Sequence, residues 1–320
     1  MKKRLILNSP SRIHLGFLEL NQNSERIFGG LGLTISKFED IISIQENQKF
    51  EVESKNLDIK NKIQDILKIF SNFKKIKKCK IVVKKFIPTH QGLGSGTQLS
   101  LSVGFLISKL NNFEMDIKQI SQILNRGNRS GIGIEAFESG GFIIDLGKNK
   151  KSKNLPLKFL NLKWPKTWKV ILIFDNELEG TSGENELKEF NNLKIIGSKF
   201  VNQNCNAVLM KVIPGILEKN FEQFSEGIRL VQKNMSKIFY GNSKLYASSK
   251  IKIIFSYLDK KGIMGYGQSS WGPTGFVFCK TIKERNELFN GLESYIKLKR
   301  FKEISLIKID GRNKGKILKS

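Results

Sequence analysis

The stretch of sequence that decides the fold is IPTHQGLGSGTQLSLSVG, residues 87–104. Three glycines at alternating positions, Gly92, Gly94 and Gly96, follow a strand-like run and precede an apolar helix. Glycine has no Cβ, so such a loop can adopt positive φ and bring backbone N–H groups close to a ligand. The first N–H groups of a helix lack partners within the helix, and the helix dipole favours an anion there. The stretch therefore predicts a phosphate-binding loop.

Polar side chains surround these glycines and add further donors. Ser95, Thr97 and Gln98 place two hydroxyls and an amide where the helix is expected to begin. The spacing fits neither the Walker loop, which needs a Lys after its last Gly, nor the GxGxxG fingerprint. The alternative is a tight structural turn. We predict that phosphate or pyrophosphate binds at Gln91, Gly92, Leu93, Gly94, Ser95, Gly96, Thr97 and Gln98.

The composition indicates a globular protein with a full core. The chain has 320 residues, 39% of them hydrophobic, enough for one large domain or two lobes. We expect no membrane span, because no run of about 18 apolar residues occurs. Cys79, Cys205 and Cys279 lie far apart, which favours buried thiols in a reducing cytoplasm. Two histidines and no CxxC pair give no basis for a transition-metal site.

The net charge of +26 raises the question of nucleic-acid binding. Nine of the 55 basic residues are Arg, and the many lysines are scattered along the chain. Basic and aromatic residues do not alternate as in an RNA-binding sheet. We therefore predict a solvated basic surface and no nucleic-acid partner. An RNA-associated protein, which would show steeply salt-dependent binding, is the alternative.

Hydrophobic periodicity indicates an α+β protein of two lobes. Residues 2–8, 40–54 and 80–87 read as strands, and residues 58–74 read as an amphipathic helix. The Lys-rich connection 148–166 favours a lobe boundary, so we divide the chain into lobes 1–160 and 161–320. Helices are expected near 200–212, 216–238 and 247–260, and a final strand at 304–309.

The glycine loop resembles the PxxxGLGSSA motif of the GHMP kinase superfamily. Pro88, Gly92, Leu93, Gly94 and Ser95 match the motif. Gly96 and Thr97 stand where the motif usually has Ser and Ala.

Four segments together resemble one family within that superfamily, the β-ribofuranosylaminobenzene 5′-phosphate synthases. They are SPSRIHLGFLEL (9–20), HQGLGSGTQLSLSVG (90–104), RGNRSGIGIEAFESGGFIIDLG (126–147) and GYGQSSWGPTGF (265–276). The resemblance implies a GHMP-kinase-like fold, with an N-terminal lobe like ribosomal protein S5 domain 2 and a ferredoxin-like C-terminal lobe. It also implies a homodimer.

The resemblance implies a pentosyltransferase rather than a kinase. The family joins phosphoribosyl pyrophosphate to 4-aminobenzoate or 4-hydroxybenzoate in the synthesis of methanopterin-type cofactors. A ring carbon attacks ribose C1, while pyrophosphate and CO2 leave. The family uses a divalent cation such as Mg2+.

Several basic residues in the matching segments are candidate catalytic groups. Arg12 can bind a phosphate through its forked guanidinium, and His14 can donate to phosphate or to the aromatic substrate. Arg129 is expected to bind a phosphate or the benzoate carboxylate. A surface arginine and a satisfied core histidine are the structural alternatives. For Arg126 the two interpretations, ligand binding and an exposed charge at a helix end, stay open.

A metal site and a second turn complete the expected site. The sequence does not decide which carboxylate among Glu135, Glu138 and Asp145 binds a metal. We predict that Glu135 and Asp145 bind Mg2+. The resemblance implies that a second glycine turn faces the loop from the other lobe. It comprises Gly267, Gln268, Ser269 and Ser270, before Trp271. Trp271 stacks on the substrate ring or belongs to the core.

The alternative function is an ATP-dependent GHMP small-molecule kinase. Such kinases often carry SGxD, with the Asp acting on the substrate hydroxyl. The matching run here is Ser130, Gly131, Ile132 and Gly133, so a glycine stands at the Asp position. A kinase without this base lacks one way to accept the hydroxyl proton.

Overall fold

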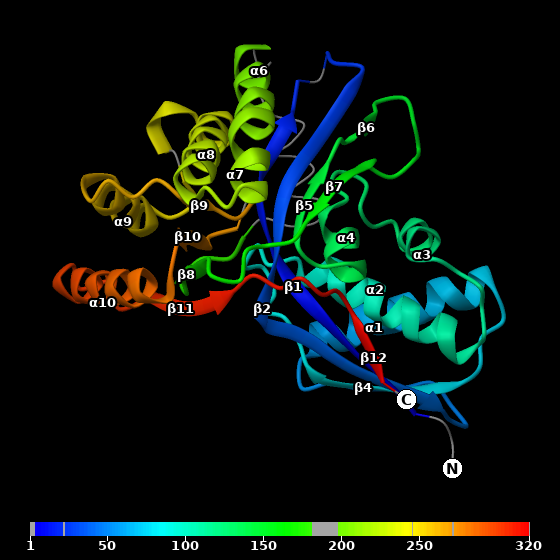
Figure 1. Cartoon of the computed structure of the whole chain (residues 1–320). Helices are drawn as coiled ribbons and strands as arrows, with labels where there is room; N and C mark the ends of the chain where they lie inside the picture. Colours follow the sequence, from blue (N-terminus) through cyan, green and yellow to red (C-terminus); the bar gives the residue numbers. More distant parts are fainter. Residues whose placement is uncertain (1–3, 22, 181–197, 245, 271, 320) are drawn as a thin grey trace.

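The computed structural model describes residues 4–21, 23–180, 198–244, 246–270 and 272–319 (Figure 1). The elements that form the first sheet and its helices are β1 (Arg4–Glu19), β2 (Arg26–Glu46), β3 (Glu51–Glu53), α1 (Leu57–Phe73), β4 (Cys79–Lys85), α2 (Ser95–Leu110), α3 (Ile117–Ile123), α4 (Ile132–Glu138), β5 (Phe142–Asp145), β6 (Lys148–Asn149) and β7 (Lys158–Leu162). The elements that follow are β8 (Lys169–Asp175), α6 (Ser198–Ala207), η1 (Val208–Val212), α7 (Ile213–Leu217), α8 (Phe221–Lys244), α9 (Ser249–Lys260), β9 (Tyr266–Gln268), β10 (Gly275–Cys279), α10 (Ile282–Leu298), β11 (Ile304–Asp310) and β12 (Ile317–Lys319).

The first sheet has the strand order β12-β1-β2-β4-β3, and β5, β6 and β7 join it beyond β2. Its helices cover one face through a core that includes Leu7, Ile44, Ile63, Leu106 and Ile120. The amphipathic pattern explains α1, because Asn56 caps its first turn and its apolar positions are buried.

The first strand is longer than the sequence predicts. β1 continues from Arg4 to Glu19 and pairs with β2, although Pro10 lies within it. The register shifts between Pro10, opposite Glu39, and Ser11, opposite Ile35, so residues 36–38 of β2 bulge out of the ladder. A bulge tolerates proline inside a sheet, since the ladder is already interrupted there. The strand therefore carries Arg12 and His14, whereas the sequence indicated a strand end before them.

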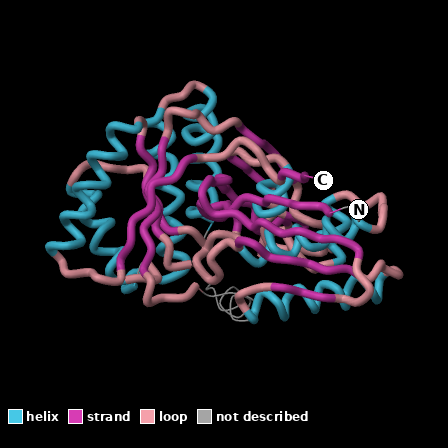
Figure 2. Tube along the Cα trace, turned by 90° about the horizontal axis from the view of Figure 1, so that it is seen from below, coloured by secondary structure: helices cyan, strands magenta, loops and turns pink. Residues whose placement is uncertain are grey.

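The second sheet is four-stranded, with the order β11-β8-β10-β9 and every pairing antiparallel. Helices α9 and α10 pack on it through a core that includes Ile173, Phe255 and Leu292. Figure 2 shows the strands of the two sheets as separate groups with helices beside them. The two-lobe α+β fold expected from the sequence is confirmed.

The lobes share one further core. Phe142 of the first sheet, Phe278 of the second and Phe224 of α8 meet around Trp164, which is 2% exposed. The division at residues 160 and 161 stays a prediction. β7 (Lys158–Leu162) crosses that point while pairing with β5, and β12 returns to pair with β1.

No helix among the described residues has the length and apolar character that crossing a bilayer requires. Cys79 and Cys279 are buried, and Cys205 is partly so. Burial raises the pKa of the Cys79 and Cys279 thiols to about 12, which fits packing residues rather than nucleophiles.

Candidate active site

The glycine loop ends in left-handed backbone at the start of α2. Gly92 has φ +71° and Gly94, the N-cap of α2, has φ +81°. Only a residue without a Cβ adopts this conformation without strain. No side chain caps the helix, and the N–H groups of Thr97 and Gln98 both donate to the carbonyl of Gly94. Within the described part of the chain the N–H groups of Ser95 and Gly96 have no hydrogen-bond acceptor, and anion binding there stays a prediction.

Two of the predicted phosphate-binding residues point into the protein instead. Leu93 is 1% exposed and belongs to the core. Gln98 is fully buried and donates through Nε2 to the carbonyl of Gly133, at 2.8 Å. Leu93 anchors the loop in the core, and Gln98 joins α2 to α4. Both side chains are buried, so neither is exposed to a ligand in solvent. The structure thus narrows the expected contacts to the backbone and the small side chains of the loop.

Arg12 lies beneath the loop. Its Nη1 donates to the carbonyl of Gly92 at 2.7 Å, and its backbone N–H donates to the carbonyl of Leu93 at 3.1 Å. A Cβ added to Gly94 would lie 3.1 Å from the guanidinium carbon of Arg12. The glycine at position 94 therefore lets the loop rest on a cationic side chain.

His14 is buried next to Arg12. Its Nδ1 accepts a hydrogen bond from the N–H of Gly16 at 3.3 Å, so the ring hydrogen sits on Nε2. Nε2 is buried and has no hydrogen-bond partner within the described part of the chain. Burial, followed by the charges of Arg12 and Arg129, lowers the pKa of His14 to about 3. His14 is therefore a neutral donor with an unused N–H group.

Three of the nine arginines gather at this end of the first lobe. Arg129 lies close enough to His14 for its charge to lower the pKa of that ring. Arg126 donates through Nε to Ser100 Oγ at 3.1 Å. Its Nη1 lies 4.0 Å from where a Cβ on Gly96 would be. The sequence left Arg126 open because this contact joins two segments thirty residues apart.

The second glycine turn contacts the loop from the other lobe, as the resemblance implied. Ser269 Oγ donates to the carbonyl of Gly92 at 2.8 Å and accepts from the N–H of His14 at 3.0 Å. Thr274 Oγ1 donates to the carbonyl of Gln91 at 2.7 Å. The turn thereby joins β1, the loop and the second sheet.

The remaining residues of this turn position it. Gln268 donates to the carbonyl of Ser270 and accepts from the N–H of Ala247. A Cβ on Gly267 would lie 2.2 Å from Gln232, so a larger residue would displace that side chain. Trp271 lies outside the described residues. His90 has φ +58°, and its carbonyl accepts from the N–H of Gly180.

The candidate metal carboxylates are already bonded within the protein. Asp145 is fully buried; Oδ1 accepts from the N–H of Gly147, and Oδ2 from the N–H of Gly131 and from Ser130 Oγ, at 2.8, 3.0 and 3.2 Å. Burial raises the pKa of Asp145 to about 6, although these hydrogen bonds oppose the shift.

Glu135 Oε2 lies 2.6 Å from Lys158 Nζ, and Glu138 is exposed. Within the described residues, no three His, Cys, Asp or Glu side chains converge on a metal position. Mg2+ needs open carboxylate oxygens, so Glu135 and Asp145 fit structural roles better than direct ligation. Their assignment to a metal stays a prediction.

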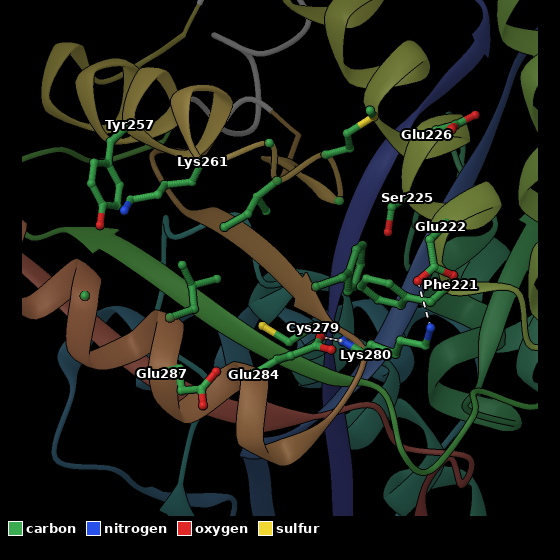
Figure 3. A pocket seen from close by; sticks show the side chains of 17 residues that line it. Phe221, Glu222, Ser225, Glu226, Tyr257, Lys261, Cys279, Lys280, Glu284 and Glu287 are labelled. Carbon is green, nitrogen blue, oxygen red and sulfur yellow. Dashed lines mark hydrogen bonds and ion pairs between the residues drawn. The ribbon is translucent and has the colours of Figure 1, made fainter.

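A large cavity lies elsewhere, in the second lobe between α8, α9 and α10 (Figure 3). Its volume is about 630 Å3, and its lining includes Phe221, Phe278 and Leu288. Glu222, Glu226, Glu284 and Glu287 also line it, and Glu222 pairs with Lys280 at 2.7 Å. None of the predicted site residues lines this cavity.

Comparison with known folds shows the same architecture in distant proteins. Residues 61–141 match the GHMP kinases N terminal domain. The homoserine kinase of Cytophaga hutchinsonii superposes with a TM-score of 0.65 at 14% identity, over 100% of this chain and 98% of the other. The mevalonate diphosphate decarboxylase of Staphylococcus aureus gives a TM-score of 0.69 at 14% identity, over 100% and 99%. At these identities the likeness concerns the fold alone.

Sequence relatives are closer. Proteins named beta-ribofuranosylphenol 5′-phosphate synthase match from Methanocaldococcus jannaschii, at 33% identity over 89% of this chain and 94% of the relative, and from Archaeoglobus fulgidus, at 29% over 97% and 98%. A third, from Methanothermobacter thermautotrophicus, is 28% identical over 84% and 87%. The chain is therefore an enzyme, and it belongs to the beta-ribofuranosylphenol 5′-phosphate synthase family.

Proposed function

We propose that this chain condenses phosphoribosyl pyrophosphate with 4-hydroxybenzoate or 4-aminobenzoate and releases CO2 and pyrophosphate. The observation that carries the proposal is the uncapped N-terminus of α2, with Arg12 beneath Gly94 and Arg126 beside Gly96. Backbone N–H groups and guanidinium groups that converge on one point suit a diphosphate. The family name of the relatives supports a product in which a ribosyl 5-phosphate is joined to a phenol.

The reaction needs no external oxidant, and its electrons balance within the two substrates. A π electron pair of the ring forms the new bond between the carboxyl-bearing carbon and ribose C1. The C1–O bond breaks and its pair leaves with pyrophosphate. The bond to the carboxylate then breaks, CO2 departs, and its pair restores the aromatic ring. No base is needed to begin the attack.

The protein then has two tasks, to stabilise the departing diphosphate and to hold the ring against C1. We assign the first to the N–H groups and hydroxyls of residues 92–97 together with Arg12, because preorganised donors stabilise developing negative charge. His14 Nε2–H and Arg129 are assigned to the acceptor or to the second phosphate. This assignment rests on their position beside the loop.

Mg2+ is also part of the proposal, on the resemblance alone. Because Glu135 and Asp145 are engaged with Lys158 and with N–H donors, the donor's own phosphate oxygens and water are the better ligands. We likewise propose a homodimer, from the resemblance, and a cytoplasmic location, from the three scattered cysteines.

The kinase alternative meets a steric obstacle. A Cβ added to Gly133 would lie 3.0 Å from Thr97 Cγ2. Thr97 therefore crowds the position at which the Asp side chain of an SGxD motif would begin. The two departures from the kinase pattern, Thr97 for Ala and Gly133 for Asp, lie side by side, and an Asp at position 133 would require Thr97 to shift.

The test is release of labelled CO2 from carboxyl-labelled 4-hydroxybenzoate and 4-aminobenzoate with phosphoribosyl pyrophosphate and Mg2+. We expect release with at least one acceptor, in equal amount to pyrophosphate. Pure folded protein that releases no CO2 from either would overturn the proposal.

A further inference from the structure

We propose that Arg126 binds the diphosphate group of the donor beside Gly96 and neutralises its charge as it leaves, without a metal ion held by protein carboxylates. The choice of ligand rests on the proposed function. The position of Arg126, and the absence of a carboxylate partner for it among the described residues, rest on the structure alone.

The backbone around Arg126 is built to hold the side chain in one place. Its N–H donates to the carbonyl of Ser121 at 2.8 Å, and its carbonyl accepts from Ser121 Oγ at 2.7 Å. Asn125 and Gly127 on either side have φ +53° and +80°. A Cβ on Gly127 would lie 2.3 Å from Ile134, so this turn is closely packed.

The guanidinium is connected to the loop through one hydroxyl, that of Ser100. Nε donates to Ser100 Oγ, and Ser100 Oγ donates to the carbonyl of Gly96 at 2.8 Å. This leaves the two terminal nitrogens of Arg126 without acceptors in the described part of the chain. Nη1 lies on the side of Gly96, 4.0 Å from the missing Cβ.

The charges require an anion between these groups. The N-terminus of α2 carries partial positive charge, and Arg126 is a half-buried cation beside it. Within the described residues no carboxylate forms an ion pair with Arg126. Two positive groups this close repel each other in the free enzyme. A diphosphate that bonds to both relieves the repulsion, and its charge matches theirs.

A departure from the superfamily motif lies beside this guanidinium. Glycine at position 96 replaces the usual serine. A side chain there would extend toward Nη1 of Arg126. A Cβ at this distance of 4.0 Å would not clash, so the exchange removes a hydroxyl beside Arg126 rather than a steric block. The guanidinium makes two parallel bonds to a phosphate where a hydroxyl makes one.

Calorimetric titration with inorganic pyrophosphate in the presence of EDTA tests the inference. Wild-type protein is compared with Arg126→Ala, Arg126→Lys and Lys118→Ala. Lys118 is exposed on α3, so its loss removes the same charge from the first lobe without touching the loop. Urea unfolding of each variant shows whether the fold is kept.

We expect wild type and Lys118→Ala to bind pyrophosphate within about threefold of each other. Arg126→Ala should bind roughly 10- to 100-fold more weakly, the usual effect of losing a hydrogen bond to a charged group. Arg126→Lys should regain only part of this, since an ammonium cannot form the paired bonds. A folded Arg126→Ala that binds like wild type would overturn the inference. If wild type binds pyrophosphate only with Mg2+, the same comparison with Mg2+ in place of EDTA decides, and equal affinities of wild type and Arg126→Ala there would also overturn it.

Failure of the proposed reaction gives a different result. One outcome is that wild type releases no CO2 while Arg126→Ala still binds pyrophosphate more weakly than wild type. In that case the anion site is supported, and the enzyme catalyses a different reaction there. If wild type releases CO2 and Arg126→Ala keeps pyrophosphate affinity, the role of Arg126 alone is wrong.

Discussion

The glycine loop and the cavity of the second lobe are two regions of opposite chemistry. The cavity has a volume of about 630 Å3, and four glutamates line it. Two of these glutamates form ion pairs with lysines, Glu222 with Lys280 and Glu226 with Lys211. Around the loop, Arg126 has no carboxylate partner among the described residues, and backbone N–H groups point outward. The comparison teaches that the direction of donors and the balance of charge, rather than volume, identify a site for an anionic substrate.

The largest expected effect comes from one methyl group placed at matched positions in the two regions. Gly94 and Gly262 both adopt left-handed backbone, with φ +81° and +71°. A Cβ on Gly94 meets Arg12 at 3.1 Å, whereas a Cβ on Gly262, in the second-lobe cavity, meets nothing within 4 Å. Both Ala variants should lose about 1 kcal/mol of stability from strain. Only Gly94→Ala should lose donor binding and activity, by roughly 100-fold or more.

Steady-state assays and urea unfolding of both variants check this prediction. Equal activities in Gly94→Ala and Gly262→Ala would break the comparison, because the loop would then have no special role.

The next largest effect concerns His14. His14→Asn keeps an acceptor for the N–H of Gly16 but loses the Nε2 donor, whereas His14→Gln can place an amide donor near Nε2. If Nε2–H contacts a substrate, CO2 release should fall about 100-fold in His14→Asn and about 10-fold in His14→Gln. With a pKa of about 3, wild-type His14 stays neutral, so its titration should not shape the activity profile between pH 5.5 and 8. Equal losses in both variants would assign His14 to packing.

A smaller effect is expected for Asp40, a buried carboxyl beneath the loop. Its Oδ1 accepts from the N–H of Ile87 at 2.9 Å, and burial raises its pKa to about 7. Unfolded Asp titrates near 3.9. Between about pH 4 and 7 the folded state therefore binds a proton that the unfolded state has released, and stability falls as pH rises.

Asp40→Asn cannot titrate and retains the acceptor for Ile87. At pH 8 the variant should exceed wild type in stability by about 1–4 kcal/mol, with less difference at pH 5. Urea unfolding at both pH values measures this. Parallel pH dependences of the two proteins would show that Asp40 is already ionised in the fold.

The smallest effect compares an ion pair from each region. Glu135 is buried against Lys158, while the pair of Glu222 with Lys280 lies on the exposed rim of the cavity. Glu135→Gln should cost about 1 kcal/mol and Glu222→Gln less than about 0.5 kcal/mol. The Mg2+ concentration needed for half-maximal activity should stay unchanged in both. A large rise in Glu135→Gln alone would restore Glu135 as a metal ligand.

The sequence predicted what depends on local pattern. Alternating glycines before an apolar run indicated the loop and α2, and helical spacing of Ile59, Ile63 and Phe70 indicated α1. The local pattern did not predict that β1 continues through Pro10. The bulge that accommodates this proline arises from the pairing with β2, which the sequence around Pro10 does not show. Nor did the local pattern predict β12, whose three residues show no hydrophobic alternation.

The sequence also did not predict that Arg126 lies near Gly96 or that Thr97 lies near Gly133. Each pair joins residues about thirty or more positions apart. One signal was present, since Gly96, Thr97 and Gly133 all depart from the superfamily pattern. Departures from a family motif can mark places where a residue distant in the sequence occupies the space or supplies the charge.

The most direct test of the central claim is calorimetric binding of phosphoribosyl pyrophosphate and of ATP, each with Mg2+, to wild type and to Gly94→Ala. We predict tight binding of the ribosyl donor, weak binding of ATP and loss of donor binding in the variant. Tighter binding of ATP than of the ribosyl donor would contradict the account and favour a kinase with a base elsewhere than position 133.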